Sequence, residues 1–217
     1  MPAWLIRHPD GLVLFDCGMH TELAEPGPLL DTVSLFFGVG MGADQTVAAG
    51  LAARHVDPAD IDVVVLSHLH FDHADGLAQI PDARGHPAHE WLAGVDDDLA
   101  AANTFRREDY DLGHDRQEID GRHDLFGDGR VMCLPTPGHT PGHQSLRVRL
   151  DSGEVVLCAD CAYFDATLEG GPLPPLGHDR EQHAASLDQL RALGAAGARL
   201  IPGHDPAAFS QLASTLR

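Results

Sequence analysis

Residues 63–76 read VVVLSHLHFDHADG, and this stretch decides the fold. Its β-branched start predicts a strand that is covered on both faces. The strand delivers His68 and His70 at i and i+2, so both side chains project on the same side as the strand ends. Asp72 and His73 follow where the chain turns. Imidazole nitrogen and carboxylate oxygen are ligands of zinc and similar metals, so one strand end and its turn can serve two adjacent metal positions.

Chance is the competing explanation, because the chain contains 15 histidines. An H-x-H-x-D-H match would arise in roughly one of a hundred such sequences. The rest of the chain decides against chance. His139 follows the strand-like "CLPT", Asp160 ends "VVLCAD", and His204 follows "ARLIP". Strand ends are where a sheet gathers distant residues into one site, so these three junctions add candidate ligands to the first group.

Together these motifs resemble the metallo-β-lactamase superfamily over residues 11 to 205. "SHLHFDHADG", "TPGHTPGHQSL", the Asp-x-x-Tyr of Asp160 and Tyr163, and the closing "GHD" resemble its N-acyl-homoserine lactone lactonases, which are quorum-quenching enzymes. The resemblance implies an α/β fold of the four-layered αββα sandwich type, formed by a single domain over residues 1–217. It also implies a hydrolase that opens the ester ring of these or similar small lactones with a bridging hydroxide at a dinuclear metal centre.

The resemblance implies a role for each candidate ligand. One metal would be bound by His68, His70 and His139, the other by Asp72, His73 and His204, with Asp160 bridging both. Zinc is the default, although Co²⁺, Mn²⁺ or Fe²⁺ fit the same ligands. Two divalent cations, two carboxylates and one hydroxide leave a net charge of about +1, which suits a neutral ester and an anionic tetrahedral intermediate.

Catalytic and substrate-binding roles follow from the same resemblance. Tyr163 would donate a hydrogen bond to the substrate carbonyl or intermediate, and Asp72 would shuttle a proton to the leaving alkoxide while it remains a ligand. Phe71 lies inside the motif, and the apolar segment 35–41 has an awkward length for an exposed loop. These residues are expected to line a slot for the acyl chain, with core packing or a dimer contact as the alternative for the segment: Phe71, Phe36, Phe37 and Met41.

Four further polar residues have supporting roles. Asp16 is expected near the site, where it supports structure and binds no metal. Asp75 is expected either to orient a histidine or to cap the next helical turn. His143 is expected to be structural or to support a ligand, and Asp205 to cap a helix that starts at Pro206. Surface or ordinary structural roles are expected for the other loop and helix histidines: His86, His89, His114, His123, His178 and His183.

Local patterns predict two groups of strands flanked by helices. Residues 3–7 and 11–16 are expected to form strands joined by a turn, and residues 44–55 a helix capped by Asp44. Further helices are expected near 88–103, 180–194 and 206–215. Further strands are expected at 129–136, 143–150, 154–161 and 198–202.

Composition limits the partners and the compartment. The net charge of −19 and the absence of lysine argue against nucleic acid, because binders of phosphate backbones carry clustered Lys and Arg. No signal-like N-terminus and no run of 18 apolar residues are present, so we expect a cytoplasmic protein with no membrane partner. Cys158 and Cys161 form a single C-x-x-C at the end of a strand, and we expect buried thiols there instead of zinc or redox chemistry.

The chain departs from the lactonase pattern at its start. Such enzymes usually carry a few dozen residues before the strand "GLVLFD", including the first strands of the sheet, so the alternatives are a misplaced start, a truncation or a sheet shortened at one edge. An uncovered edge strand is an association risk, which leaves a homodimer or poor solubility as expectations. The alternatives for function are a glyoxalase II-like thioesterase, a β-lactamase, a phosphodiesterase, or an inactive paralogue that serves as a metal-stabilised binding protein.

Overall fold

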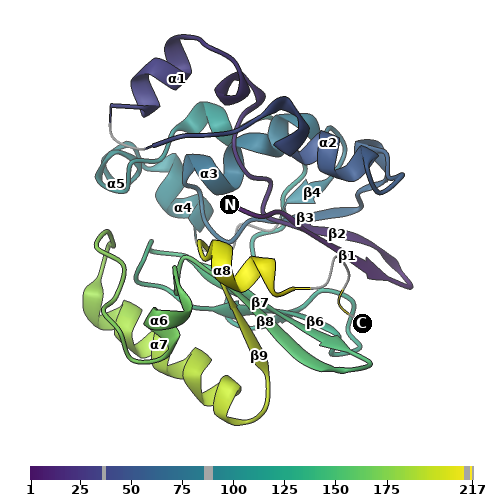
Figure 1. The fold of residues 1–217 in the computed structure, drawn as a ribbon, viewed down its shortest axis with the longest axis vertical. Helices are drawn as coiled ribbons and strands as arrows, with labels where there is room; N and C mark the ends of the chain where they lie inside the picture. The colour runs from purple at the N-terminus through teal and green to yellow at the C-terminus, as the bar shows by residue number, and fades with distance from the viewer. Residues whose placement is uncertain (36–37, 86–89, 213–215, 217) are drawn as a thin grey trace. The chain divides into compact units, whose positions relative to one another are not determined.

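The computed structural model describes residues 1–35, 38–85, 90–212 and 216. The chain divides into two compact units, each with its own β-sheet. The first unit comprises Met1–His86 and Thr104–Gln117, and the second comprises Pro87–Asn103 and Glu118–Arg217. The chain runs from its purple N-terminus in the first unit to its yellow C-terminus in the second (Figure 1).

The first unit contains a four-stranded sheet in the order β1-β2-β3-β4. The antiparallel pair β1 and β2 is joined by the predicted tight turn, and β2 runs parallel to β3, which is buried throughout its length. β4 is too short for any sequence pattern to predict. The strands are β1 (Trp4–His8), β2 (Gly11–Phe15), β3 (Val63–Val65) and β4 (Arg84–Gly85).

Short helices lie between and after the strands of this sheet along the chain. They are η1 (Thr21–Ala24), α1 (Pro28–Val33), η2 (Ala43–Gln45), α2 (Val47–Ala52), η3 (Pro58–Asp60), α3 (Phe71–Ala74), η4 (Asp75–Gln79) and η5 (Arg107–Asp109). The predicted cap at Asp44 is wrong, because Asp44 lies within η2. Thr46 is the N-cap of α2, and its hydroxyl accepts a hydrogen bond from the Ala49 amide at 3.2 Å.

The second unit contains a five-stranded sheet in the order β5-β6-β7-β8-β9. All neighbours are antiparallel except β8 and β9, which are parallel. The predicted strand at 154–161 ends early, because Ala159 adopts a positive φ of 44° and turns the chain at Asp160. The strands are β5 (His123–Asp124), β6 (Val131–Pro135), β7 (Gln144–Leu150), β8 (Gly153–Ala159) and β9 (Arg199–Pro202).

One long helix, α7 (Arg180–Ala195), packs on this sheet. Its Leu187 and Leu190 join a buried cluster with Leu134 of β6 and Val156 of β8. The helical pattern predicted near 88–103 is interrupted, because Asp96 takes an extended conformation and caps a second helix. The other helices of this unit are α4 (Glu90–Val95), α5 (Asp97–Ala102), α6 (Asp165–Leu168) and α8 (Pro206–Ser210).

Two further predictions are confirmed in this unit. Asp205 caps α8, where its carboxylate accepts hydrogen bonds from the Ala207 and Ala208 amides. Cys158 and Cys161 are free and buried, and burial raises the pKa of the Cys158 thiol to about 12. A protonated thiol in an apolar core is neither a nucleophile nor a ready metal ligand, so both residues act as small core side chains.

A membrane-spanning helix is not found in the described part of the chain, since no helix there combines sufficient length with sufficient apolar character.

Candidate metal centre

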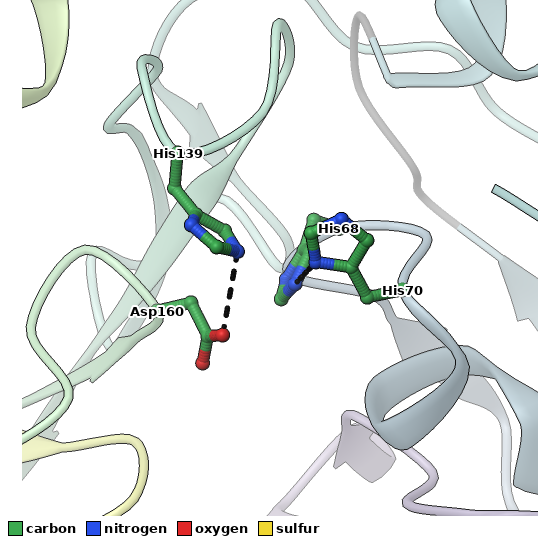
Figure 2. A group of neighbouring side chains, drawn as sticks. All are labelled: His68, His70, His139 and Asp160. Carbon is green, nitrogen blue, oxygen red and sulfur yellow. Dashed lines mark hydrogen bonds and ion pairs between the residues drawn. The ribbon is translucent and has the colours of Figure 1, made fainter. Parts of the chain in front are cut away.

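In the first unit, the chain beyond β3 places two imidazoles against each other. His68 is fully buried and His70 is half-buried. The Nε2 atom of His68 lies 2.9 Å from Nδ1 of His70, and the rings meet edge to face (Figure 2). The sequence predicted that the strand itself would deliver both histidines, but β3 ends at Val65, so the loop that follows it brings the two rings together.

The next two candidate ligands lie on α3. His73 is buried and Asp72 is half-buried, and Nε2 of His73 lies 3.7 Å from Oδ2 of Asp72. The ring of His73 also lies against His68, with centroids 4.0 Å apart. The turn after the strand therefore keeps all four candidates of this unit in one cluster.

Asp16 fixes the orientation of His73. Its Oδ2 atom lies 2.9 Å from Nδ1 of His73, and its two carboxylate oxygens also accept hydrogen bonds from the amide and hydroxyl of Ser67. A carboxylate on Nδ1 holds the proton there and leaves the Nε2 lone pair for a metal. The predicted supporting role of Asp16 agrees with these contacts, whereas the sequence did not reveal Ser67.

In the second unit, Asp160 lies between two histidines. Its Oδ2 atom is 3.3 Å from Nε2 of His139, the pair joined by a dashed line in Figure 2. Its Oδ1 atom is 3.0 Å from Nε2 of His204. Nε2 of His204 also lies 3.3 Å from Oδ2, so the Asp160 carboxylate is in contact with both imidazoles.

The ends of β8 and β9 are joined so that Asp160 and His204 meet. The Gly203 amide donates to the Ala162 carbonyl and the His204 amide to the Tyr163 carbonyl, both at 2.8 Å. A Cβ atom at Gly203 would lie 2.6 Å from the Ala159 carbonyl oxygen, which is too close for any side chain. The glycine of "PGHD" is therefore required by the close approach of the two chains.

Two contacts orient the remaining groups of this unit. Nδ1 of His139 lies 3.3 Å from the Leu176 carbonyl, so its Nε2 faces Asp160. Tyr163 is half-buried, and its ring centroid lies 4.7 Å from that of His204 and 5.8 Å from that of His139. The predicted catalytic tyrosine therefore lies beside two candidate ligands.

The predicted substrate-binding residues have different outcomes. Phe71 is the half-buried first residue of α3, next to Asp72. Met41 is half-buried between α1 and η2, whereas Phe36 and Phe37 lie outside the described residues. Phe105 was not predicted, although its ring lies 5.5 Å from that of His70. No sequence pattern reveals Phe105, because it follows α5 in an irregular segment.

Asp75 neither orients a histidine nor caps the next helical turn, so both expectations for it are wrong. Its side chain forms a hydrogen bond with the carboxyl group of Asp109 and another with the backbone of His20. Burial, and then the charge of Asp75, raises the pKa of Asp109 to about 8, and burial also raises the pKa of Asp75. Asp75 and Asp109 are both buried, and their contact links η4 to η5.

Two further histidines are structural within the second unit. His143 is buried, and its Nδ1 atom lies 2.9 Å from the Thr136 hydroxyl, in agreement with the sequence analysis. His183 is also buried and lies 2.9 Å from the Cys161 carbonyl. Its contact with the residue after Asp160 was not foreseen.

The donor set fits divalent metals. The seven candidates are histidines and aspartates, each of which offers a ligand atom, and the contacts of His73 with Asp16 and of His139 with the Leu176 carbonyl engage Nδ1, the ring nitrogen opposite Nε2. Neutral imidazoles and carboxylates are the ligands that zinc and related ions prefer. The candidate residues thus suit a metal-dependent enzyme.

Comparisons with known proteins agree with this chemistry. Residues 2–204 match the sequence model of the metallo-beta-lactamase superfamily. The N-acyl homoserine lactonase AttM of Azorhizobium caulinodans is 33% identical, over 96% of this chain and 83% of the relative. The enzyme of the same name from Agrobacterium fabrum is 32% identical, over 97% of this chain and 83% of the relative.

Solved structures support the same fold. A quorum-quenching N-acyl homoserine lactone lactonase superposes with a TM-score of 0.82 at 24% identity, over 97% of this chain and 82% of the other. A structure of an N-acyl homoserine lactone hydrolase with N-hexanoyl-L-homoserine at its catalytic metal centre gives the same TM-score and identity, over 97% of this chain and 83% of the other. The predicted fold class is confirmed, and the chain belongs to the metallo-beta-lactamase superfamily.

Proposed function

We propose that this protein is a metal-dependent hydrolase that opens the ester ring of N-acyl homoserine lactones or similar small lactones. The observation that carries the proposal is the 33% identity with the lactonase AttM, which extends over 96% of this chain. The position of Asp160 between His139 and His204 supports it, because a carboxylate in contact with two imidazoles provides ligands for the metal that the proposed hydrolysis needs.

The proposed centre holds two divalent ions, with zinc as the default occupant. His68, His70 and His139 bind one ion, Asp72, His73 and His204 bind the other, and Asp160 bridges them. The Asp160 carboxylate contacts both His139 and His204, which supports the bridging role. The Nδ1 contact with Asp16 supports Nε2 ligation by His73.

When bound, such ions polarise an ester carbonyl and lower the pKa of a water molecule. The residues of this chain then orient the lactone and move the proton that the attacking water releases. The Tyr163 hydroxyl donates a hydrogen bond to the lactone carbonyl oxygen, where negative charge develops during ring opening. Asp72 carries a proton to the alkoxide that leaves, and the open ring ends as a hydroxyl and a carboxylate.

The acyl chain binds along apolar side chains near Phe71 in this proposal. Phe71 and Asp72 are consecutive residues of α3, so Phe71 lies beside the proposed metal centre. Phe36, Phe37 and Met41 are the further candidates from the sequence. A homoserine lactone with an acyl chain would use both parts of this site, the ester at the metals and the chain at the phenylalanine.

Two broader expectations belong to the same proposal. Four free cysteines suit the reducing cytoplasm, where disulfides are rare. β1 lies at the edge of its sheet, and an edge strand offers unpaired backbone groups to a second copy, so we expect a homodimer. Light scattering of the purified protein would measure the mass, and a monomer at micromolar concentration would contradict the homodimer.

Metal analysis followed by a substrate panel tests the function. We expect about two equivalents of metal per chain, and hydrolysis of homoserine lactones that a strong chelator abolishes and added Zn²⁺ restores. The panel should include lactones with acyl chains of different lengths and a glutathione thioester. Hydrolysis of the thioester without any lactone opening would replace the proposed substrate, and bound metal without hydrolysis of any ester would indicate a binding protein.

A further inference from the structure

His183 is a buried titratable side chain that the proposed chemistry does not use. It lies in the first half of α7 and is 1% exposed. Its Nε2 atom donates a hydrogen bond to the Cys161 carbonyl oxygen at 2.9 Å. A histidine on a long helix thus contacts the backbone of the residue that follows Asp160.

The turn that holds Asp160 is conformationally strained. Ala159 has a φ of 44°, a left-handed conformation that costs a residue with a Cβ about 1–2 kcal/mol. The turn continues with backbone hydrogen bonds from Cys161 to Cys158 and from Ala162 to Ala159, at 3.2 and 3.3 Å. A strained turn persists only where its surroundings hold it, and the His183 imidazole supplies one such contact.

The beginning of α7 also contacts the loop that carries His139. The Asp179 amide donates to the Gly138 carbonyl and the His178 amide to the His139 carbonyl, both at 2.9 Å. A Cβ atom at Gly138 would lie 2.1 Å from the His183 backbone nitrogen, so only glycine allows this approach. The rings of His183 and His139 have their centroids 6.0 Å apart.

Two more side chains extend this polar face along the helix. The Ser186 hydroxyl donates to the Pro137 carbonyl at 2.7 Å, and the Gln189 amide donates to the Pro135 carbonyl at 3.2 Å. The spacing of three residues from His183 to Ser186 to Gln189 keeps all three on one side of the helix. One face of α7 therefore binds the His139 loop at several points and the Asp160 turn through His183.

We propose that His183 is a positioning residue, which holds the Asp160 turn to α7 and thereby sets the spacing of the Asp160 carboxylate and the His139 imidazole. The inference rests on the proposed function only in assuming that these two side chains bind metal. It assigns His183 no contact with metal or substrate. Its effect is transmitted through the backbone of Cys161.

Metal affinity of the full-length protein tests this role. Apoprotein would be titrated with Zn²⁺ against a chromophoric chelator, for the wild type, His183→Ala, His183→Gln and Leu187→Ala. Loss of a residue that orients a metal ligand typically lowers affinity by about 10- to 100-fold, and we expect His183→Ala to fall in that range. His183→Gln should recover most of the affinity, because its amide nitrogen can reach the Cys161 carbonyl without an imidazole.

Leu187→Ala is the matched control. Leu187 is equally buried on the same helix, four residues further on, in the core cluster that also contains Cys161 and Ala162, but its apolar side chain forms no hydrogen bond with the Asp160 turn. Its substitution should lower thermal stability while metal affinity remains near that of the wild type. If Leu187→Ala weakens metal binding as much as His183→Ala, general destabilisation of α7 explains the effect and the inference is overturned.

Amide hydrogen exchange provides a readout that needs no metal and no activity. In apoprotein, His183→Ala should accelerate exchange at Cys161 and Ala162, whose amides close the turn, and His183→Gln should not. Unchanged exchange together with unchanged Zn²⁺ affinity in His183→Ala would overturn the inference.

The outcome separates this inference from the proposed function. Wild-type protein that binds metal and opens lactones, with a His183→Ala variant of equal affinity, overturns the inference alone. Metal binding that depends on His183 without lactone opening supports the inference and contradicts the function. Wild-type protein that binds no divalent metal overturns both.

Discussion

At the scale of single residues, the sequence identifies ligand-type side chains but few of their partners. The expected supporting role of Asp16 agrees with its contacts to His73 and Ser67. Ser67 is 51 residues away from Asp16 in sequence. Asp16 also has a positive φ of 59°, which no nearby sequence pattern predicts. Asp75 was misjudged for the same reason, because its partner Asp109 comes from a distant segment. The chemistry of a residue is local, whereas its contacts depend on the fold.

Tyr163 carries the catalytic prediction at this scale. Tyr163→Phe removes the hydroxyl and keeps the ring that lies beside His204 and His139. Loss of one donor to a developing oxyanion costs on the order of a hundredfold in kcat, and we expect that decrease with the bound metal unchanged. Steady-state kinetics on a homoserine lactone and metal analysis would measure both. Equal turnover in the two proteins would remove Tyr163 from the mechanism.

At the scale of elements, the long patterns were predicted well and the short ones were not. The strands β6, β7 and β9 and the helix α7 lie where apolar patterns place them. The two-residue strands β4 and β5 are held by their neighbours in the sheets and have no pattern of their own. Helix boundaries depended on which polar residue caps the helix, and at α2 that residue is Thr46 instead of the predicted Asp44.

The cap of α2 can be tested directly. Thr46→Ala removes the hydroxyl that accepts from the Ala49 amide, and loss of an N-cap costs about 1 kcal/mol of unfolding free energy. Asp44→Ala is the matched control, and it should change stability by less than about 0.5 kcal/mol because Asp44 does not cap α2. Urea unfolding of the two variants would compare them. A larger loss of unfolding free energy in Asp44→Ala than in Thr46→Ala would support Asp44 as the cap, as the sequence predicted.

The carboxyl pair that links η4 and η5 makes stability depend on pH. Asp109 has a native pKa of about 8 against an ordinary value of 3.8, so the folded protein keeps a proton that the unfolded chain loses. Between about pH 4 and pH 8 this contribution lowers stability as pH rises. Burial, Asp75 and Glu108 raise the pKa of Asp109, and Arg106, whose guanidinium lies 3.4 Å from the Asp109 carboxylate, opposes them.

Asp109→Asn should therefore be more stable than the wild type at pH 8. The amide keeps a hydrogen bond for Asp75 and no longer ionises, while the lost attraction to Arg106 offsets part of the gain. We expect an increase on the order of 1–2 kcal/mol at pH 8 that disappears near pH 4. Urea unfolding of apoprotein across this range would measure it, with Asp111→Asn on the same segment as the control. A variant less stable than the wild type at pH 8 would contradict the raised pKa.

At the scale of the whole molecule, the sequence was sufficient to predict the family. The spacing of H-x-H-x-D-H and the later glycine-histidine pairs predicted the metallo-β-lactamase fold, which the family match over residues 2–204 confirms. The net charge of −19 is a second property of the whole chain. Cations bound by the seven candidate ligands would reduce the repulsion between the negative charges of this chain.

Metal removal should accordingly lower the stability of the whole protein. A ligand that binds only the folded state contributes about 2.7 kcal/mol when its free concentration is one hundred times its Kd. We expect a chelator to lower the thermal midpoint by several degrees and added Zn²⁺ to restore it, and scanning calorimetry would record both. Calcium at the same concentration is the control, because it prefers oxygen ligands over imidazole. An unchanged midpoint would contradict tight metal binding by the folded protein.

The interlocked ends of β8 and β9 have a consequence for how this protein can vary. The amides of Gly203 and His204 donate to the carbonyls of Ala162 and Tyr163, and Gly203 leaves no space for a side chain. The loop after β8 and the loop after β9 are therefore coupled, so a substitution that shifts one of them also shifts the other. A change of shape near Tyr163, selected for a different lactone, would displace His204 as well, so its benefit would depend on the residues around His204. Mutations in these loops should be strongly epistatic, and new specificities are reached more readily through segments that bear no ligand.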